Sequence, residues 1–194
     1  MNVHDLPMGG CATSTAHYAH LEDGDAACQN EGYQVVYADP PWRYSFSKTS
    51  NRKVENHYQT MTQADLTAAC PVPLADDAVL YLWATAPKLL EALEVLDAWG
   101  FRYVTQAVWD KERLGMGYWF RGQHELILVG VRGKVSPPIP GVRRSSVFRA
   151  PRGRHSAKPT EVRDHIAAAF PDARKVELFA RVRVPGWDAW GNEA

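Results

Sequence analysis

The sequence predicts one α/β domain, in which a single mixed, mostly parallel sheet is covered by helices on both faces. Its 194 residues are enough for one well-buried core and too few for two ordinary domains. A composition of 45% hydrophobic and 23% charged residues is typical of a globular protein. Short apolar runs alternate with stretches of helical periodicity, which favours an α/β sheet whose ligands bind beyond the carboxyl ends of the strands.

The elements begin after a leading segment that has no sustained period. Residues 1–31 are polar and rich in Gly, Ala and Thr, so we expect a flexible N-terminal arm before a domain at 32–194. The β-branched and aromatic run at 33–38 predicts a buried strand that ends at Asp39. A capping-box pattern at 62–65 then opens a short helix.

The remaining elements follow from apolar runs and the residues that end them. Four leucines recur at helical spacing between positions 89 and 96, and Gly100 ends that helix. Val162, Ile166 and Phe170 share one face of a helix that has Pro near its start. In chain order we expect a strand at 78–84, a helix at 89–100, strands at 101–109, 125–131 and 147–150, a helix at 159–170 and a strand at 175–179.

The charges are unevenly distributed along the chain, although the formal net charge is zero. Residues 1–42 contain no Lys or Arg, whereas residues 126–160 contain no Asp or Glu. An acid-free block suits contact with nucleic-acid phosphates, because each paired cation releases condensed counterions. A solvated basic loop is the alternative. The basic residues of this block are Arg132, Lys134, Arg143, Arg144, Arg149, Arg152, Arg154 and Lys158.

Several protein classes are disfavoured by what the sequence lacks. No apolar stretch reaches the roughly 18 residues of a membrane span and no signal peptide is visible, so we expect a cytoplasmic protein without a membrane partner. The cysteines form no C-x-x-C pair, and P-loop and dinucleotide fingerprints are absent. We expect no metal, because the spacing of the one fitting set of ligands matches no common zinc pattern. That set is Cys11, His17, His20 and Cys28.

The strongest candidate for chemistry is the tetrad Asp39-Pro40-Pro41-Trp42. Each proline fixes its own φ, carries no N–H and holds the preceding residue extended, so the loop is rigid. The Asp39 carboxylate and the Pro40 carbonyl can then accept the two N–H groups of an amine. Trp42 offers a ring on which an extruded base can stack, unless the tetrad is an ordinary turn in which Trp42 fills the core. Further candidates for that stacking role are Tyr44, Tyr58 and Trp109.

Paired acceptors would activate an exocyclic base amine, which is a poor nucleophile because its lone pair is delocalised into the ring. Acceptors on both hydrogens favour a localised lone pair that can attack a sulfonium methyl group in line, without a metal. This logic does not itself name adenine, so cytosine N4 and a protein amide stay open as acceptors.

At these residues the sequence resembles the MT-A family, the adenine-N6 methyltransferases named for the seventy-kilodalton subunit of the eukaryotic mRNA adenosine methyltransferase. The resemblance covers residues 33–193 and rests on the order and spacing of several motifs. It implies a Rossmann-like methyltransferase fold with a permuted motif order, S-adenosyl-L-methionine as cofactor, and DNA or RNA as substrate. Beyond the tetrad, the motifs lie at 57–61, 80–85, 117–122, 124–130, 155–159, 177–181 and 186–193.

The resemblance also implies roles for individual residues. The tetrad would be catalytic, with Asp39 and Pro40 also meeting the cofactor. Lys158, just before a helix N-terminus, would meet the cofactor's methionine carboxylate, unless it is simply solvated. Further cofactor contacts would come from Arg181, Asn192 and Glu193. Together with the basic block, the family pattern places substrate contacts at Tyr44, Tyr58, Trp109, Lys111, His124, Glu125, Arg143, Arg144 and Arg149.

A second interpretation makes the chain a catalytically silent nucleic-acid-binding subunit, because the family contains such partners for its enzymes. The intact tetrad argues against it. The active unit is open between a monomer, a homodimer and a pair with another family subunit. Targeting modules of eukaryotic relatives have no counterpart here, so we expect DNA in preference to RNA.

Overall fold

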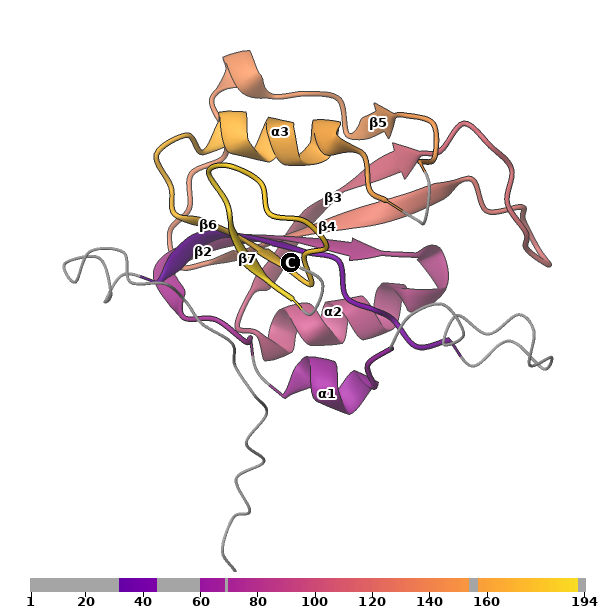
Figure 1. Cartoon of the computed structure of the whole chain (residues 1–194), viewed down its shortest axis with the longest axis horizontal. Coiled ribbons are helices and arrows are strands. Elements are labelled where there is room, and N and C mark those ends of the chain that lie inside the picture. Colours follow the sequence, from indigo (N-terminus) through magenta and orange to yellow (C-terminus); the bar gives the residue numbers. More distant parts are fainter. Residues whose placement is uncertain (1–31, 45–59, 69, 154–156, 192–194) are drawn as a thin grey trace, which may run out of the picture. The chain divides into compact units, whose positions relative to one another are not determined.

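A single mixed sheet forms the centre of the computed structural model, which describes residues 32–44, 60–68, 70–153 and 157–191 (Figure 1). Within that part of the chain the strand order is β5-β3-β4-β2-β1-β6-β7. The pairs β1·β2, β1·β6, β3·β5 and β6·β7 are parallel, whereas β2·β4 and β3·β4 are antiparallel. The prediction of a mixed, mostly parallel sheet is confirmed. The strands are β1 (Tyr33–Ala38), β2 (Leu74–Ala84), β3 (Arg102–Asp110), β4 (His124–Arg132), β5 (Val147–Arg149), β6 (Lys175–Leu178) and β7 (Asp188–Trp190).

Helices cover both faces of this sheet, as expected (Figure 1). On one face α1 (Gln63–Thr67) and α2 (Leu89–Ala98) contribute Leu66, Val95 and Leu96 to a buried cluster with β1 and β2. On the other face α3 (Thr160–Ala169) contributes Val162 and Ile166 to a second cluster. The two short 3-10 turns among the described residues are η3 (Ala86–Lys88) and η4 (Pro140–Val142).

Covering both faces explains why the central strands are apolar without alternation. In β1 every residue except Gln34 is buried, and in β2 the run from Ala78 to Ala84 is buried throughout. These two buried strands therefore hold the residues after their carboxyl ends, Asp39 and Thr85, in fixed positions.

Local signals set the helix boundaries. The capping box at α1 is present, because the Thr62 hydroxyl accepts the Asp65 N–H and the Asp65 carboxylate accepts the Thr62 N–H. Gly100 follows α2 with a φ of 79°, a left-handed conformation that glycine adopts without steric cost.

Leu90 is 73% exposed, so the leucine pattern of α2 does not lie wholly on its buried face. β7 was not predicted, since three residues are too few to show a period.

None of the helices among the described residues is long and apolar enough to cross a bilayer.

Lys175 is a buried cation that ties the end of α3 to the sheet. Its side chain begins at β6, and the residue is only 8% exposed. The ammonium donates to the carbonyl oxygens of Phe170, Pro171 and Ala173 at 2.9, 3.0 and 2.6 Å. These carbonyls follow the last turn of α3, where a helix leaves acceptors unpaired and favours positive charge.

Replacing Lys175 with Met should lower the free energy of unfolding by about 2–3 kcal/mol, because three carbonyl oxygens lose a charged donor. Lys134→Met, on an exposed side chain, is the matched control and should change stability by less than about 0.5 kcal/mol. Urea unfolding followed by circular dichroism measures both. Equal stability of the two variants would contradict a capping role for Lys175.

Candidate active site

The candidate site lies at the sheet edge where β1, β2, β3, β5 and β6 all end. Ala38 at the end of β1 is opposite Leu82 of β2 and Leu178 of β6. The antiparallel β4 begins at the same edge, since its His124 is opposite Asp110. Asp39 therefore emerges between two parallel neighbours, as predicted, at the edge where α/β sheets bind ligands.

The tetrad loop is held by backbone bonds and by a buried indole. The Trp42 N–H donates to the Pro40 carbonyl at 2.8 Å, and the Met61 N–H donates to the Pro41 carbonyl at 3.0 Å. Trp42 is only 5% exposed, and its Nε1 donates to the Trp83 carbonyl at 3.0 Å. In this structure Trp42 anchors the loop in the core and presents no open ring face to a base.

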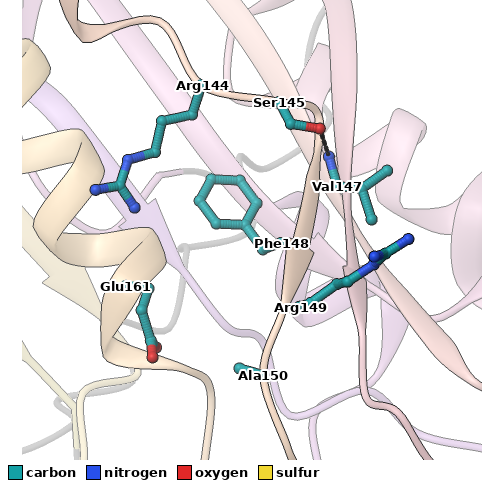
Figure 2. A pocket seen from close by; sticks show the side chains of 7 residues that line it. All are labelled: Arg144, Ser145, Val147, Phe148, Arg149, Ala150 and Glu161. Carbon is teal, nitrogen blue, oxygen red and sulfur yellow. Dashed lines mark hydrogen bonds between the residues drawn. The ribbon is translucent and has the colours of Figure 1, made fainter.

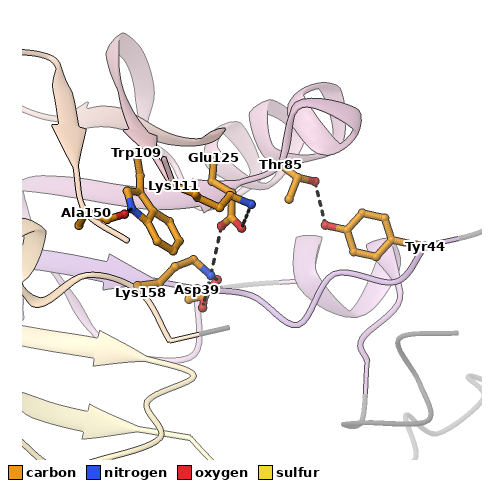
Figure 3. A network of polar contacts seen from close by, with 8 residues as sticks. All are labelled: Asp39, Tyr44, Thr85, Trp109, Lys111, Glu125, Ala150 and Lys158. Carbon is orange, nitrogen blue, oxygen red and sulfur yellow. Dashed lines mark hydrogen bonds and ion pairs between the residues drawn. The ribbon is translucent and has the colours of Figure 1, made fainter. Parts of the chain in front are cut away.

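Asp39 pairs with a lysine that lies 119 residues further along the chain. Lys158 Nζ is 2.6 Å from both carboxylate oxygens of Asp39 and 3.4 Å from Glu125 Oε2 (Figure 3). The other oxygen of Glu125 accepts from Lys111 Nζ at 2.9 Å. Two carboxylates and two ammonium groups thus alternate in a line, Asp39–Lys158–Glu125–Lys111, which we call the charge relay line.

The two central members of the line, Glu125 and Lys158, favour each other's charged form. Burial of Glu125 opposes its charged form, but the ammonium groups of Lys158 and Lys111 outweigh burial and hold the pKa of Glu125 below its usual range. Burial also opposes the charged form of Lys158, yet the Asp39 and Glu125 carboxylates raise the pKa of Lys158 above its usual range. The pairing therefore keeps Glu125 and Lys158 ionised in spite of their burial.

Two tryptophan rings pack against the lysines of this line. Lys158 Nζ lies 5.3 Å from the centre of the Trp83 ring, and Lys111 Nζ lies 5.7 Å from that of Trp109. The two rings pack edge to face with centroids 5.9 Å apart. Trp109 is 1% exposed, and its Nε1 donates to the Ala150 carbonyl at 2.9 Å. Trp109, which was predicted to stack on the base, is buried in this structure and packs against Lys111.

Tyr44 lies on the opposite flank of the tetrad. Its hydroxyl is 2.8 Å from Thr85 Oγ1, at the end of β2, and Lys88 Nζ is 5.5 Å from its ring centre (Figure 3). Tyr44 is partly exposed, so it is the described aromatic residue best placed to meet a base beside Asp39.

The predicted cofactor segment begins beside Asp39. The Asp39 N–H donates to the Leu178 carbonyl at 3.5 Å, a long bond that places the end of β6 against the tetrad. Phe179 has a φ of 61°, and such left-handed geometry in a bulky residue is uncommon and concentrates at functional sites. Arg181 follows as an exposed residue. The predicted residues Tyr58, Asn192 and Glu193 lie outside the described residues.

Of the three arginines predicted to contact substrate, two line a cavity and one lies outside it. Arg144 and Arg149 line a cavity of about 290 Å³ around the Phe148 ring, with Glu161 of α3 on its wall (Figure 2). Arg143 lies outside it and donates through Nε to the Pro138 carbonyl at 2.7 Å. Arg149 is opposite Asp110 in the sheet, so this residue lies at the same edge as the charge relay line, whereas Arg144 precedes the start of β5. His124 is exposed at the start of β4.

No cluster of His, Cys, Asp and Glu suited to a metal ion occurs in the parts of the chain that the structure describes. The alternative zinc set of Cys11, His17, His20 and Cys28 lies outside those parts.

Comparison with known proteins decides the family, since the MT-A70 family model matches residues 33–193. The chain belongs to the MT-A70 family. It is 36% identical to the Type II methyltransferase M.MunI of a Mycoplasma species, over 83% of this chain and 77% of that protein. It is 31% identical to the N(6)-adenosine-methyltransferase catalytic subunit METTL3 of Homo sapiens, over 83% of this chain and 28% of that protein.

The MT-A70-like N(6)-adenosine-methyltransferase of Arabidopsis thaliana is 30% identical, with 24% of its length covered. The chain therefore spans most of the Mycoplasma relative but only about a quarter of these eukaryotic ones. MT-A70 proteins are methyltransferases, and the sheet with its two helical layers is the Rossmann-like methyltransferase fold expected from the sequence.

Sequence reasoning missed two parts of the site. It assigned no role to Trp83, although a tryptophan that ends the strand next to β1 must lie close to Asp39. It also missed the pairing of Lys111 with Glu125, for which the signal was the hairpin geometry that places residues 109–111 opposite 123–125. The contact between Lys158 and Asp39 carries no local signal, because it joins distant parts of the chain.

Removing the shared cation should change how stability depends on pH. In the wild type, the depressed pKa of Glu125 contributes stability above its unfolded pKa of about 4.3, which is lost as pH falls through the lower folded pKa. The raised pKa of Lys158 contributes stability below about pH 10.4, which is lost as pH rises through the higher folded pKa. The contribution of these two groups to the free energy of unfolding should therefore be constant between about pH 5 and 9.

In Lys158→Met, Glu125 loses one of the two cations that lower its pKa, so its pKa should rise and the variant should gain stability relative to the wild type as pH falls from 7 toward 5. Urea unfolding across this range measures the two profiles. Parallel profiles for wild type and variant would contradict the pairing.

Proposed function

We propose that this chain transfers the methyl group of S-adenosyl-L-methionine to the N6 amine of adenine in nucleic acid, with DNA as the favoured polymer. The observation that carries the proposal is the Asp39 carboxylate, held by Lys158 at the sheet edge in a rigid Pro-Pro loop beside the Pro40 carbonyl. An amine needs two acceptors in fixed positions, and this loop supplies them.

Both acceptors keep capacity for a substrate. The Pro40 carbonyl accepts the Trp42 N–H with one of its two lone pairs. The Asp39 carboxylate has about four lone-pair sites and uses two on Lys158. Lys158 orients the carboxylate, and Glu125 and Lys111 hold Lys158 in turn. The remaining sites can bind the two N–H groups of an adenine amine and localise its lone pair.

Transfer forms a nitrogen–carbon bond and breaks a sulfur–carbon bond. When bound, the cofactor supplies an activated methyl group on a sulfonium. The methylated nitrogen then carries one proton too many, which Asp39 accepts and passes to water. Positioning and electrostatics account for the rate enhancement, and no other covalent step is required.

The residues beside Asp39 fit this cofactor chemically. Lys158 is the proposed cation for the methionine carboxylate, which would replace one of the present contacts of its ammonium with Asp39 and Glu125. Asp39 and Glu125 are the proposed anions for the positive sulfonium and amino groups. Phe179 and Arg181 begin the segment that we assign to further cofactor contacts, together with Asn192 and Glu193. The site therefore offers a cation for the negative group of the cofactor and anions for its positive groups.

The substrate side of the site is the basic cavity and its surroundings. Arg144 and Arg149 are suited to backbone phosphates, because both are exposed and line this cavity, and Arg149 lies at the sheet edge at which Asp39 emerges. Tyr44 and Tyr58 are the proposed contacts with the target base, and Glu125 and His124 the proposed wall beside it. We favour DNA because the relative that the chain matches over most of both lengths is named a Type II methyltransferase.

Asp39→Asn tests the catalytic role, because it keeps the size of the side chain and removes its charge. We expect kcat for methyl transfer from labelled cofactor to fall by at least about 100-fold, the scale seen when one preorganised polar contact to a transition state is lost. The control is Asp97→Asn on the exposed side of α2, which should retain full activity. Activity of Asp39→Asn within threefold of wild type would overturn the proposal.

A double variant, Arg144→Ala with Arg149→Ala, tests the phosphate contacts. The slope of log binding constant against log salt should shrink by about 1.8, since each lost duplex phosphate contact removes about 0.9. Arg102→Ala is the control, because Arg102 is exposed at the opposite end of β3. An unchanged slope in the double variant would show that the cavity does not face the phosphates.

The silent-subunit alternative makes a different prediction. It requires nucleic-acid binding without cofactor binding, which calorimetry with S-adenosylhomocysteine measures directly.

A further inference from the structure

A protruding apolar tip joins β3 to β4. We define the tip as residues 114–120, within a connection that extends well beyond the strands in Figure 1. Five of its large apolar side chains are exposed: Leu114 58%, Met116 85%, Tyr118 102%, Trp119 94% and Phe120 89%. Large aromatic residues are usually mostly buried, so a contiguous exposed set marks a binding surface.

The tip is a turn whose backbone is held by hydrogen bonds. The Gly115 N–H donates to the Gly122 carbonyl at 2.8 Å, and the Gly122 N–H donates to the Met116 carbonyl at 3.3 Å. Arg121 Nε donates to the Gly115 carbonyl at 3.0 Å. A Cβ on Gly117 would overlap the Phe120 carbonyl oxygen, so the turn requires glycine there. The fold thus presents three consecutive aromatic side chains to solvent on a closed turn.

The base of the tip is part of the active site. The Lys111 N–H donates to the Gln123 carbonyl at 2.9 Å, which closes the connection just above β3 and β4. Lys111 Nζ then begins the charge relay line that ends at Asp39. The tip therefore projects from the sheet edge at which Asp39 emerges, on the side of the basic cavity.

We propose that the tip is an aromatic wedge that stacks on nucleobases beside the target nucleotide and holds the target base out of a duplex. This proposal rests on the proposed function. Tyr, Trp and Phe rings stack on any base, and apolar side chains that enter between base steps unstack them. A target amine inside a duplex cannot reach Asp39 unless its nucleotide is extruded, and extrusion needs something to fill or support the gap.

Charge favours a nucleic acid as the occupant. Residues 112–122 contain Arg113 and Arg121 against a single acid, Glu112, while the neighbouring Lys111 is already paired with Glu125. The cations flank the aromatic residues on both sides in sequence, which is the arrangement expected when a ring enters between bases while neighbouring cations meet the phosphates. The acid-free stretch 126–160 follows directly along the chain.

The test is a triple variant, Tyr118→Ala with Trp119→Ala and Phe120→Ala, compared with Leu90→Ala on the exposed surface of α2. Methylation rates are measured on a duplex and on the same sequence as a single strand. For the triple variant we expect the ratio of duplex to single-strand rate to fall at least about tenfold, because a single strand needs no extrusion. Leu90→Ala should leave the ratio unchanged.

Binding by fluorescence anisotropy across a salt series gives a second readout. The triple variant should bind duplex at least about tenfold more weakly with an unchanged salt slope, since stacking releases no counterions. Arg113→Ala with Arg121→Ala should lower the slope by about 1.8.

Three outcomes would overturn the wedge. If the triple variant methylates duplex and single strand in the wild-type ratio, the aromatic side chains do not assist extrusion. If the wild type sediments as a dimer and the triple variant as a monomer with unchanged nucleic-acid affinity, the tip instead binds a second copy. If the wild type neither binds nor methylates nucleic acid, the proposed function fails, and the wedge with it.

Discussion

The ion pair between Asp39 and Lys158 is the contact on which the rest of the site depends. It joins the residue after β1 to a residue two positions before α3, and the two are 119 positions apart in the chain. Lys158 is held over Trp83 and against Glu125, so its ammonium approaches Asp39 from a fixed direction. The carboxylate that we assign to catalysis is therefore oriented before any substrate arrives, which is the condition for electrostatic preorganisation.

The tryptophans explain how so many charges stay together near a protein core. Trp42, Trp83 and Trp109 are nearly fully buried and lie at the ends of the loop or strands that form the site. The rings of Trp83 and Trp109 pack against Lys158 and Lys111, and the indole N–H groups of Trp42 and Trp109 donate to carbonyls of neighbouring segments. The buried tryptophans thus form a rigid apolar layer on which the charged side chains of the site pack.

Much of the fold could be predicted from the sequence, because β1 and β2 are continuous apolar runs, α3 has its apolar residues on one face, and α1 begins with a capping box. Asp39 was placed correctly at a strand's carboxyl end by the same reasoning. The stacking roles expected of Trp42 and Trp109 stay without structural support, since composition cannot distinguish a ring that faces a ligand from one that faces the core. The charge relay line could not be predicted, because its members meet only through the strand order of the sheet.

The most direct test of the central claim is the identity of the methylated product. Nucleoside mass spectrometry of DNA incubated with the protein and labelled S-adenosylmethionine should detect N6-methyladenine, and none when Asp39 is replaced by Asn. Label found in N4-methylcytosine, or equal yields of N6-methyladenine from wild type and Asp39→Asn, would contradict the account.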